Sequence, residues 1–287
     1  MFKTRYHLCD VFGIPLYLDF SLIILLLMFV TGDGEFWSGI MCAALLLASI
    51  TAHELGHALT ARGFGCQTKD ITLSLLGGCA SLIALPRKAS QEFWTAIAGP
   101  AVSFALAILA SMGIALAATE GGLFDAFGLI LSIALGSFGI NVFIGDGLNF
   151  SESSIVVIQT FMYLGVMNLM LGFFNLLPGF PMDGGRVFRS AMRPFMSRVQ
   201  ATRIAMVVGR VVAVGIGLRG LWSLFNRGSW GVVSLLIAWM IWREGYREYM
   251  LAQMESSWFY EDNGTFRAKV SPPPYGGDGD DCDVTRG

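Results

Sequence analysis

The string Thr51-Ala-His-Glu-Leu-Gly-His-Ala58 contains two histidines four positions apart. Residues at this spacing lie on one face of an α-helix, about 6 Å apart along its axis. Two imidazoles placed in this way can converge on one Zn²⁺ ion through bonds of about 2.0–2.1 Å. Glu54 follows His53 directly, close enough to accept a proton from a water that the metal activates. The spacing therefore predicts a hydrolytic zinc site, with His53 and His57 as ligands and Glu54 as the general base.

The surroundings of this motif favour a functional role. His7 is the only other histidine in the chain. The motif lies inside an apolar segment, where each charged group costs about 2.5–3.5 kcal/mol on membrane-insertion scales. A structural polar contact between helices is the alternative, but metal binding and catalysis explain this cost better.

A catalytic zinc ion takes three protein ligands and keeps one position open. With no third histidine at hand, the third ligand should be a carboxylate or a cysteine. The five cysteines are widely spaced and form no C-x-x-C pair, which disfavours a thiolate site. In the stretch Phe174–Arg186, two prolines and three glycines break an apolar segment immediately around Asp183. We therefore predict Asp183 as the third ligand. The alternative is that Asp183 caps the next helix.

The composition indicates a polytopic membrane protein. Hydrophobic residues make up 54% of the 287 residues and charged residues only 14%, against about 25% charged in soluble domains. The net charge of −2 and the absence of a basic cluster argue against a nucleic-acid partner. Six segments could cross a bilayer, which needs about 20 apolar residues per helix: Leu16–Val30, Trp37–Arg62, Gln91–Ala118, Ile155–Leu177, Ile204–Leu224 and Trp230–Trp242.

Other stretches add detail to this expectation. Asp70–Leu85 alternates β-favouring residues around Gly77-Gly78, which predicts a membrane-associated β-hairpin with a two-residue turn. Ala126–Ile144 is apolar, and we interpret it as a dipping or re-entrant element. Lys and Arg gather in alternate connections, which places both termini in the cytoplasm. The fold class is thus an all-α polytopic membrane protein with about six transmembrane helices and a small hairpin.

We expect two parts along the chain. Residues 1–250 form the membrane-embedded metalloprotease domain. Residues 251–287 form a polar tail with three consecutive prolines and an acidic Gly/Asp run, which is typical of disorder.

These motifs together resemble the site-2 protease family of intramembrane zinc metalloproteases. The resemblance rests on HELGH at 53–57, IAGPAVSF at 97–104 and NLLPGFPMDGG at 175–185, and it covers about residues 8–250. Many family members have Asn three residues beyond the Gly-Pro pair, where this chain has Ser103. The stretch between His57 and Asp183 is also long for the compact members of the family.

The resemblance implies one zinc ion per chain, held by His53, His57 and Asp183, with Glu54 as the base. It also implies that Asn175 helps to hold the scissile peptide or its oxyanion. The hairpin at Gly77 and Gly78 would present a strand edge to an unwound substrate. The partners are then the lipid bilayer and a transmembrane protein substrate, cut by regulated intramembrane proteolysis.

Two other interpretations compete with this one. A membrane metalloprotease of another lineage would use a downstream glutamate as its third ligand, but Glu92, Glu120 and Glu152 lack a helical partner motif. A transporter or scaffold would carry H-E-x-x-H by accident, since broken helices and buried ions suit transporters too. No inverted repeat is visible, however, and an intact Glu54 argues against an inactive enzyme.

Overall fold

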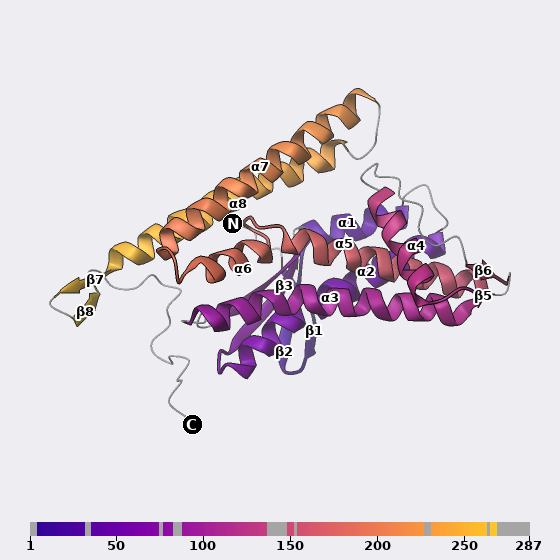
Figure 1. Cartoon of the computed structure of the whole chain (residues 1–287), viewed down its shortest axis with the longest axis horizontal. Helices are drawn as coiled ribbons and strands as arrows, with labels where there is room; N and C mark the ends of the chain where they lie inside the picture. The colour runs from indigo at the N-terminus through magenta and orange to yellow at the C-terminus, as the bar shows by residue number, and fades with distance from the viewer. Residues whose placement is uncertain are drawn as a thin grey trace. The chain divides into compact units, whose positions relative to one another are not determined.

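The computed structural model describes residues 5–31, 36–74, 77–82, 88–136, 148–151, 154–226, 231–262 and 265–268. Helices dominate this part of the chain, and small sheets accompany them (Figure 1). The helices are α1 (Phe20–Thr31), α2 (Phe36–Gly63), α3 (Ala89–Ala117), α4 (Leu123–Gly136), α5 (Ile155–Leu176), α6 (Asp183–Met192), α7 (Arg198–Phe225) and α8 (Gly231–Trp258). The strands are β1 (Arg5–Val11), β2 (Ile14–Asp19), β3 (Thr68–Ser74), β4 (Gly77–Leu82), β5 (Ala118–Glu120), β6 (Asn149–Phe150), β7 (Phe259–Asp262) and β8 (Thr265–Ala268).

Four of the described helices, α2, α3, α5 and α7, are long and apolar enough to cross a membrane. They coincide with four of the six predicted spans, and the exact number six is not confirmed. The predicted first span is divided, because residues 16–19 belong to strand β2 and leave α1 only 12 residues long. Helix α8 is long enough, but its apolar part ends at Trp242 and a run of charged residues follows.

The chain divides into two units. The first unit comprises residues 1–59, 68–81 and 98–174 and contains a four-stranded sheet in the order β1-β2-β3-β4. Strands β1 and β2 are antiparallel, and Val11 pairs with Ile14 across a two-residue turn. Phe12 and Gly13 in this turn have φ of 52° and 78°, as a type I′ hairpin turn requires. Strand β2 then pairs in parallel with β3.

The predicted hairpin region does contain two neighbouring strands, β3 and β4, but its turn was placed two residues too late. Gly77 and Gly78 are the first residues of strand β4 and not a turn. The connection from β3 to β4 lies at residues 75–76, which are outside the described residues. A stretch with no Pro and several β-favouring residues is compatible with strand on both sides of Gly77, so the pattern located the strands but not their turn.

Two apolar clusters hold the first unit together. In one cluster the sheet packs on α1 and α2, through Ile14, Leu16, Leu22, Ile50, Ala58, Ile71 and Leu73. The other joins α3, α4 and α5 through Ala107, Ala110, Ile114, Ala126, Ile130, Ala134 and Leu169. Alanines are frequent in the second cluster because small side chains let helices approach closely.

The second unit comprises residues 60–67, 82–97 and 175–287. Its main feature is the long pair formed by α7 and α8, which lie side by side (Figure 1). The pair is antiparallel, since Gly220 lies against Gly231 and Gly217 faces Ala238. Helix α7 begins with a capping box, in which Ser197 Oγ accepts from Gln200 N and Gln200 Oε1 accepts from Ser197 N.

Two further predictions can be compared with the structure only in part, because some of their residues lie outside the described residues. The apolar stretch 126–144 forms α4 as far as Gly136, and residues 137–147 lie outside the described part, so its re-entrant placement stays a prediction. The expected boundary at residue 250 falls inside α8, which continues to Trp258 because its charged and polar residues remain good helix formers. Strands β7 and β8 then pair as a short hairpin. Residues 269–287 lie outside the described residues.

Gly209 provides a test of the packing in the second unit. A Cβ atom there would lie 2.7 Å from the carbonyl oxygen of Phe180, which is backbone and cannot move aside cheaply. Gly209→Ala should therefore lower the free energy of unfolding by about 1–3 kcal/mol, measured by thermal or denaturant unfolding in detergent.

Gly215→Ala on the same helix is the matched control, because no heavy atom lies within 4 Å of the added Cβ. It should be neutral or raise stability by up to about 1 kcal/mol, as replacing a helical glycine usually does. Equal effects of the two substitutions would contradict the close contact between α7 and the loop at Phe180.

Candidate metal centre

His53 and His57 lie one turn apart on α2, and both rings are buried, with exposed fractions of 2% and 7%. Their Nε2 atoms point at one another across 3.2 Å. Two bonds of about 2.0–2.1 Å that meet at a tetrahedral angle separate the two donor atoms by about 3.3 Å. The pair therefore already has the spacing that two ligands of one tetrahedral metal ion need, as the sequence predicted.

Helices α2 and α3 cross closely, and the glycines at this crossing leave space for the two imidazole rings. A Cβ at Gly56 would lie 2.9 Å from the carbonyl oxygen of Ala98 on α3. A Cβ at Gly99 would lie 2.7 Å from His53 Nε2 and closer still to His57 Nε2. Only a residue without a side chain fits at these two positions. The Ala-Gly-Pro sequence on α3 thus provides the space that the imidazoles occupy.

Ser103 holds the first histidine in orientation. Its Oγ lies 2.9 Å from His53 Nδ1, and its side chain is fully buried. A histidine that binds metal through Nε2 carries its proton on Nδ1, and the partner of that N–H fixes both the tautomer and the ring orientation. Ser103 can accept this hydrogen bond. In the sequence, Ser103 stands out only as a departure from the family pattern. Gly99 and Ser103, four apart on one helix, were the signal for a helix face that receives the histidines.

Glu54 lies on α2 between the two histidines and is 6% exposed. Its role as the general base stays a prediction.

Asp183 is the first residue of α6, in a half-buried position. The N-cap of this helix is Met182, and no side chain caps it. The alternative that Asp183 serves as the helix cap is therefore not supported. His53 and His57 belong to the first unit and Asp183 to the second, so Asp183 as the third ligand stays a prediction.

The backbone around Asp183 is tightly packed. A Cβ at Gly184 would lie 2.4 Å from the carbonyl oxygen of Leu176, and a Cβ at Gly185 would lie 2.8 Å from the backbone of Gly179. The end of α5 and the following loop therefore pass directly over the start of α6. The two glycines after Asp183 are a steric requirement of this crossing.

A buried ion pair holds α6 in the second unit. Arg189 is 4% exposed, and its Nε donates to Glu92 Oε1 over 2.8 Å, with a second bond from Nη2 to the same oxygen. Arg189 Nη1 also lies 3.6 Å from Glu248 of α8, and its guanidinium stacks on Phe180 at 4.9 Å. Arg189 thus ties α6 to α3, to α8 and to the loop that precedes Asp183.

The remaining residues predicted from the sequence lie in other elements. Asn175 lies near the end of α5 in a half-buried position, and Gly77 and Gly78 begin strand β4. Of the glutamates considered as alternative ligands, Glu92 is paired with Arg189, and Glu120 accepts from Asn149 Nδ2 over 2.6 Å. Glu152 lies outside the described residues.

Comparison with known proteins places these features in context. Residues 41–216, more than half of the chain, match Peptidase family M50. A zinc metalloprotease of Methanocaldococcus jannaschii is 28% identical over 254 residues, which are 87% of this chain and 62% of that protein. A Mycobacterium tuberculosis relative, Rip3, is 36% identical over 201 residues, 69% of this chain and 43% of Rip3. The chain therefore spans about two fifths to three fifths of the length of these relatives.

One solved structure is also similar. The site-2 protease from Methanocaldococcus jannaschii superposes with a TM-score of 0.55 and 27% sequence identity. The match covers 85% of this chain and 95% of that one. The helical arrangement described above is therefore the fold of that protease.

Ser103 allows a direct test of the histidine geometry. Ser103→Ala removes the acceptor for His53 Nδ1, and loss of such a partner typically weakens metal binding by about 10- to 100-fold. The affinity should be measured by chelator competition with Zn²⁺ as the probe.

Ser111→Ala is the matched control, because Ser111 is also a fully buried serine of α3 but donates only to the carbonyl of Ala107. It should leave the affinity unchanged. If Ser103→Ala and Ser111→Ala bind Zn²⁺ as tightly as the unmodified chain, Ser103 does not orient a metal ligand.

Proposed function

Because the chain belongs to Peptidase family M50, we propose that it is an intramembrane zinc metalloendopeptidase. It hydrolyses peptide bonds in or near transmembrane segments of membrane-protein substrates. The observation that carries this proposal is the buried pair of Nε2 atoms on α2, 3.2 Å apart, with Glu54 beside them. Relatives named as zinc metalloproteases and the similar site-2 protease structure support the choice of metal and reaction.

The roles of the residues follow from their chemistry. His53 and His57 supply neutral imidazole nitrogens and Asp183 a carboxylate oxygen, a donor set typical of a catalytic zinc site with one open position. When bound, zinc acts as a Lewis acid that acidifies water and polarises a peptide carbonyl. Glu54 accepts the proton of the attacking water and passes it to the leaving amine. Burial of all three α2 side chains supports this assignment, because low-dielectric surroundings strengthen each of these interactions.

Substrate contacts form the second part of the proposal. Asn175 has amide groups that can hold the scissile peptide or its developing oxyanion. Strand β4, which begins at Gly77 and Gly78, is the last strand in the order β1-β2-β3-β4. A strand in this position can pair with an extended peptide through main-chain hydrogen bonds. An unwound segment of a transmembrane substrate would offer that extended backbone.

The biological setting is also a proposal. Four apolar helices long enough to cross a bilayer support a membrane protein. The distribution of Lys and Arg favours both termini in the cytoplasm and insertion in the cell membrane. We infer that the substrate is a single-span membrane protein and that its cleavage is a step of regulated intramembrane proteolysis.

Replacing Glu54 separates catalysis from metal binding. Glu54→Gln keeps the shape of the side chain and removes the base, so zinc should remain bound while cleavage falls by about 10²–10⁴-fold. Purified protein should be assayed against a tagged library of transmembrane substrates, with metal content measured in parallel. Glu120→Gln is the control, because Glu120 is an exposed carboxylate whose hydrogen bond is to Asn149. Activity of Glu54→Gln within a few fold of the unmodified chain would assign the base elsewhere.

Replacing Asp183 tests the third ligand. An amide oxygen carries no full charge, so Asp183→Asn should weaken zinc binding and lower cleavage, whereas His53→Ala or His57→Ala should lose most of the zinc. His7→Ala should lose none. Asp125→Asn is the matched control, since Asp125 accepts from the backbone N–H of Gly122 and Asn serves that role as well as Asp. Normal zinc content and normal cleavage in Asp183→Asn would remove Asp183 from the site.

A further inference from the structure

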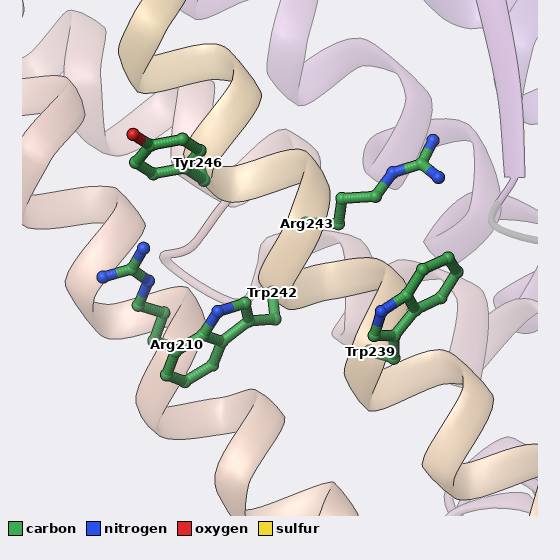
Figure 2. Close-up of a pocket in the computed structure, with 5 residues that line it drawn as sticks. All are labelled: Arg210, Trp239, Trp242, Arg243 and Tyr246. Atoms are coloured by element: carbon green, nitrogen blue, oxygen red, sulfur yellow. The ribbon is translucent and has the colours of Figure 1, made fainter.

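Helices α7 and α8 carry a pocket lined by two arginines and three aromatic residues (Figure 2). Arg210 comes from α7, and Trp239, Trp242, Arg243 and Tyr246 come from α8. None of these residues belongs to the zinc-binding motifs. The pocket lies entirely within the second unit, so its geometry depends only on the close pairing of α7 and α8.

Arg210 lies against two aromatic rings of α8. Its guanidinium carbon lies 4.7 Å from the centre of the Trp242 ring and 5.7 Å from that of Tyr246 (Figure 2). Its Nε atom is buried and makes no hydrogen bond. Within the part of the chain that the structure describes, no carboxylate pairs with this arginine. A partly buried guanidinium that no carboxylate of the described residues neutralises is a favourable place for an anion.

The position along the helices indicates the depth of the pocket. Helix α8 is apolar from Gly231 to Trp242 and then reads Arg-Glu-Gly-Tyr-Arg-Glu, so the apolar surface ends at Trp242. Trp and Tyr at such a boundary are typical of the membrane–water interface. Arg210 stacks on Trp242 and therefore lies at the same level, although it belongs to the apolar helix α7. A cation at this boundary would face the layer of lipid headgroups.

Arg243 supplies a second cation. It stacks on Trp239 at 5.2 Å, and its side chain is 62% exposed. Its Nη2 lies 3.1 Å from Glu244 Oε1, while Glu244 also lies 3.4 Å from Arg247. An exposed ion pair of this kind contributes little to stability. If Arg243 moves away, Glu244 still has Arg247 as a partner. Arg243 can therefore turn one face of its guanidinium to a phosphate, which arginine binds in a bidentate manner.

We propose that this pocket binds the headgroup of an anionic phospholipid. The phosphate group contacts Arg210, Arg243 adds a second positive charge to the pocket, and the exposed rings of Trp239, Trp242 and Tyr246 contact the glycerol and the first part of the acyl chains. A lipid fits better than free phosphate, because the three rings are about half exposed and offer apolar surface that an inorganic ion leaves uncovered. The proposal goes beyond peptide hydrolysis and does not depend on it.

Substitution of arginine by lysine distinguishes a specific site from general attraction between basic residues and anionic lipid. The full chain should be reconstituted in nanodiscs of phosphatidylcholine, with or without phosphatidylglycerol. Retained phosphatidylglycerol is then counted by native mass spectrometry, and the thermal midpoint is measured. Arg210→Lys keeps the net charge but loses the planar, stacked guanidinium, so we expect about tenfold weaker retention of phosphatidylglycerol. The rise in thermal midpoint that phosphatidylglycerol gives the unmodified chain should shrink accordingly.

Arg203→Lys is the matched control, because Arg203 is an exposed arginine on the same helix. It should behave as the unmodified chain. Trp242→Leu is a second variant, which keeps both cations and removes the ring under Arg210; it should lose phosphatidylglycerol to a similar extent. Each variant must keep the thermal midpoint of the unmodified chain in phosphatidylcholine alone to within a few degrees. A variant that does not is replaced by Trp242→Met, or by Arg210→Gln compared with Arg203→Gln.

Two results would overturn the proposal. Equal retention of phosphatidylglycerol by Arg210→Lys, Arg203→Lys and the unmodified chain would show attraction by net charge only. Equal stabilisation of the unmodified chain by inorganic phosphate in phosphatidylcholine nanodiscs would assign the pocket to a free anion instead of a lipid. Failure of this experiment leaves the zinc and cleavage measurements untouched, since neither uses this pocket.

Discussion

Buried polar side chains inside an apolar helix need hydrogen-bond partners, and helix α2 carries several such side chains close together along its length. His53 Nδ1 meets Ser103 Oγ of α3, and Ser49, one turn earlier on α2, accepts from Asn168 Nδ2 of α5. These contacts are buried, so breaking either one would leave an unpaired polar group at a cost of about 1–3 kcal/mol. They fix the rotation of α2 against α3 and α5 in a way that apolar contacts alone would not. The direction in which the imidazoles point follows from this rotation.

The conformation around Asp183 depends on a different constraint. Glycines without side chains let two backbone segments come into direct contact there. Gly184 lies under the carbonyl groups at the end of α5, and Gly209 of α7 lies under the loop at Phe180. Crowded backbone of this kind has few alternative conformations, because packed cores do not deform continuously. The buried pair of Arg189 and Glu92 adds a directional contact, and removing one partner from such a pair typically costs about 3–5 kcal/mol. A carboxylate on the first residue of α6 is thereby held on a rigid support.

Much of the fold could be predicted from local signals. The positions of α2, α3, α5 and α7 follow from apolar segments whose length matches a bilayer. The errors arise where a local pattern fits two structures equally well. Residues 16–19 are apolar enough for a helix, yet they pair with β1 and β3 as strand β2. Gly77-Gly78 resembles a hairpin turn but begins strand β4. Pairing with the sequence-distant strand β3 decided the first case, whereas the second is a shift of register within one hairpin.

For the candidate metal centre, the sequence by itself determined the two histidines and the glutamate, because the helical repeat alone puts positions 53 and 57 on one face. It also indicated Asp183, through the count of histidines and the Pro/Gly-rich break around it. Tertiary structure alone decided what orients His53. Ser103 lies 50 positions from His53, and the need for Gly99 exists only because another helix crosses there. Spacing along one helix is a local property that the chain encodes directly, whereas the partner of a side chain depends on which helix packs against it.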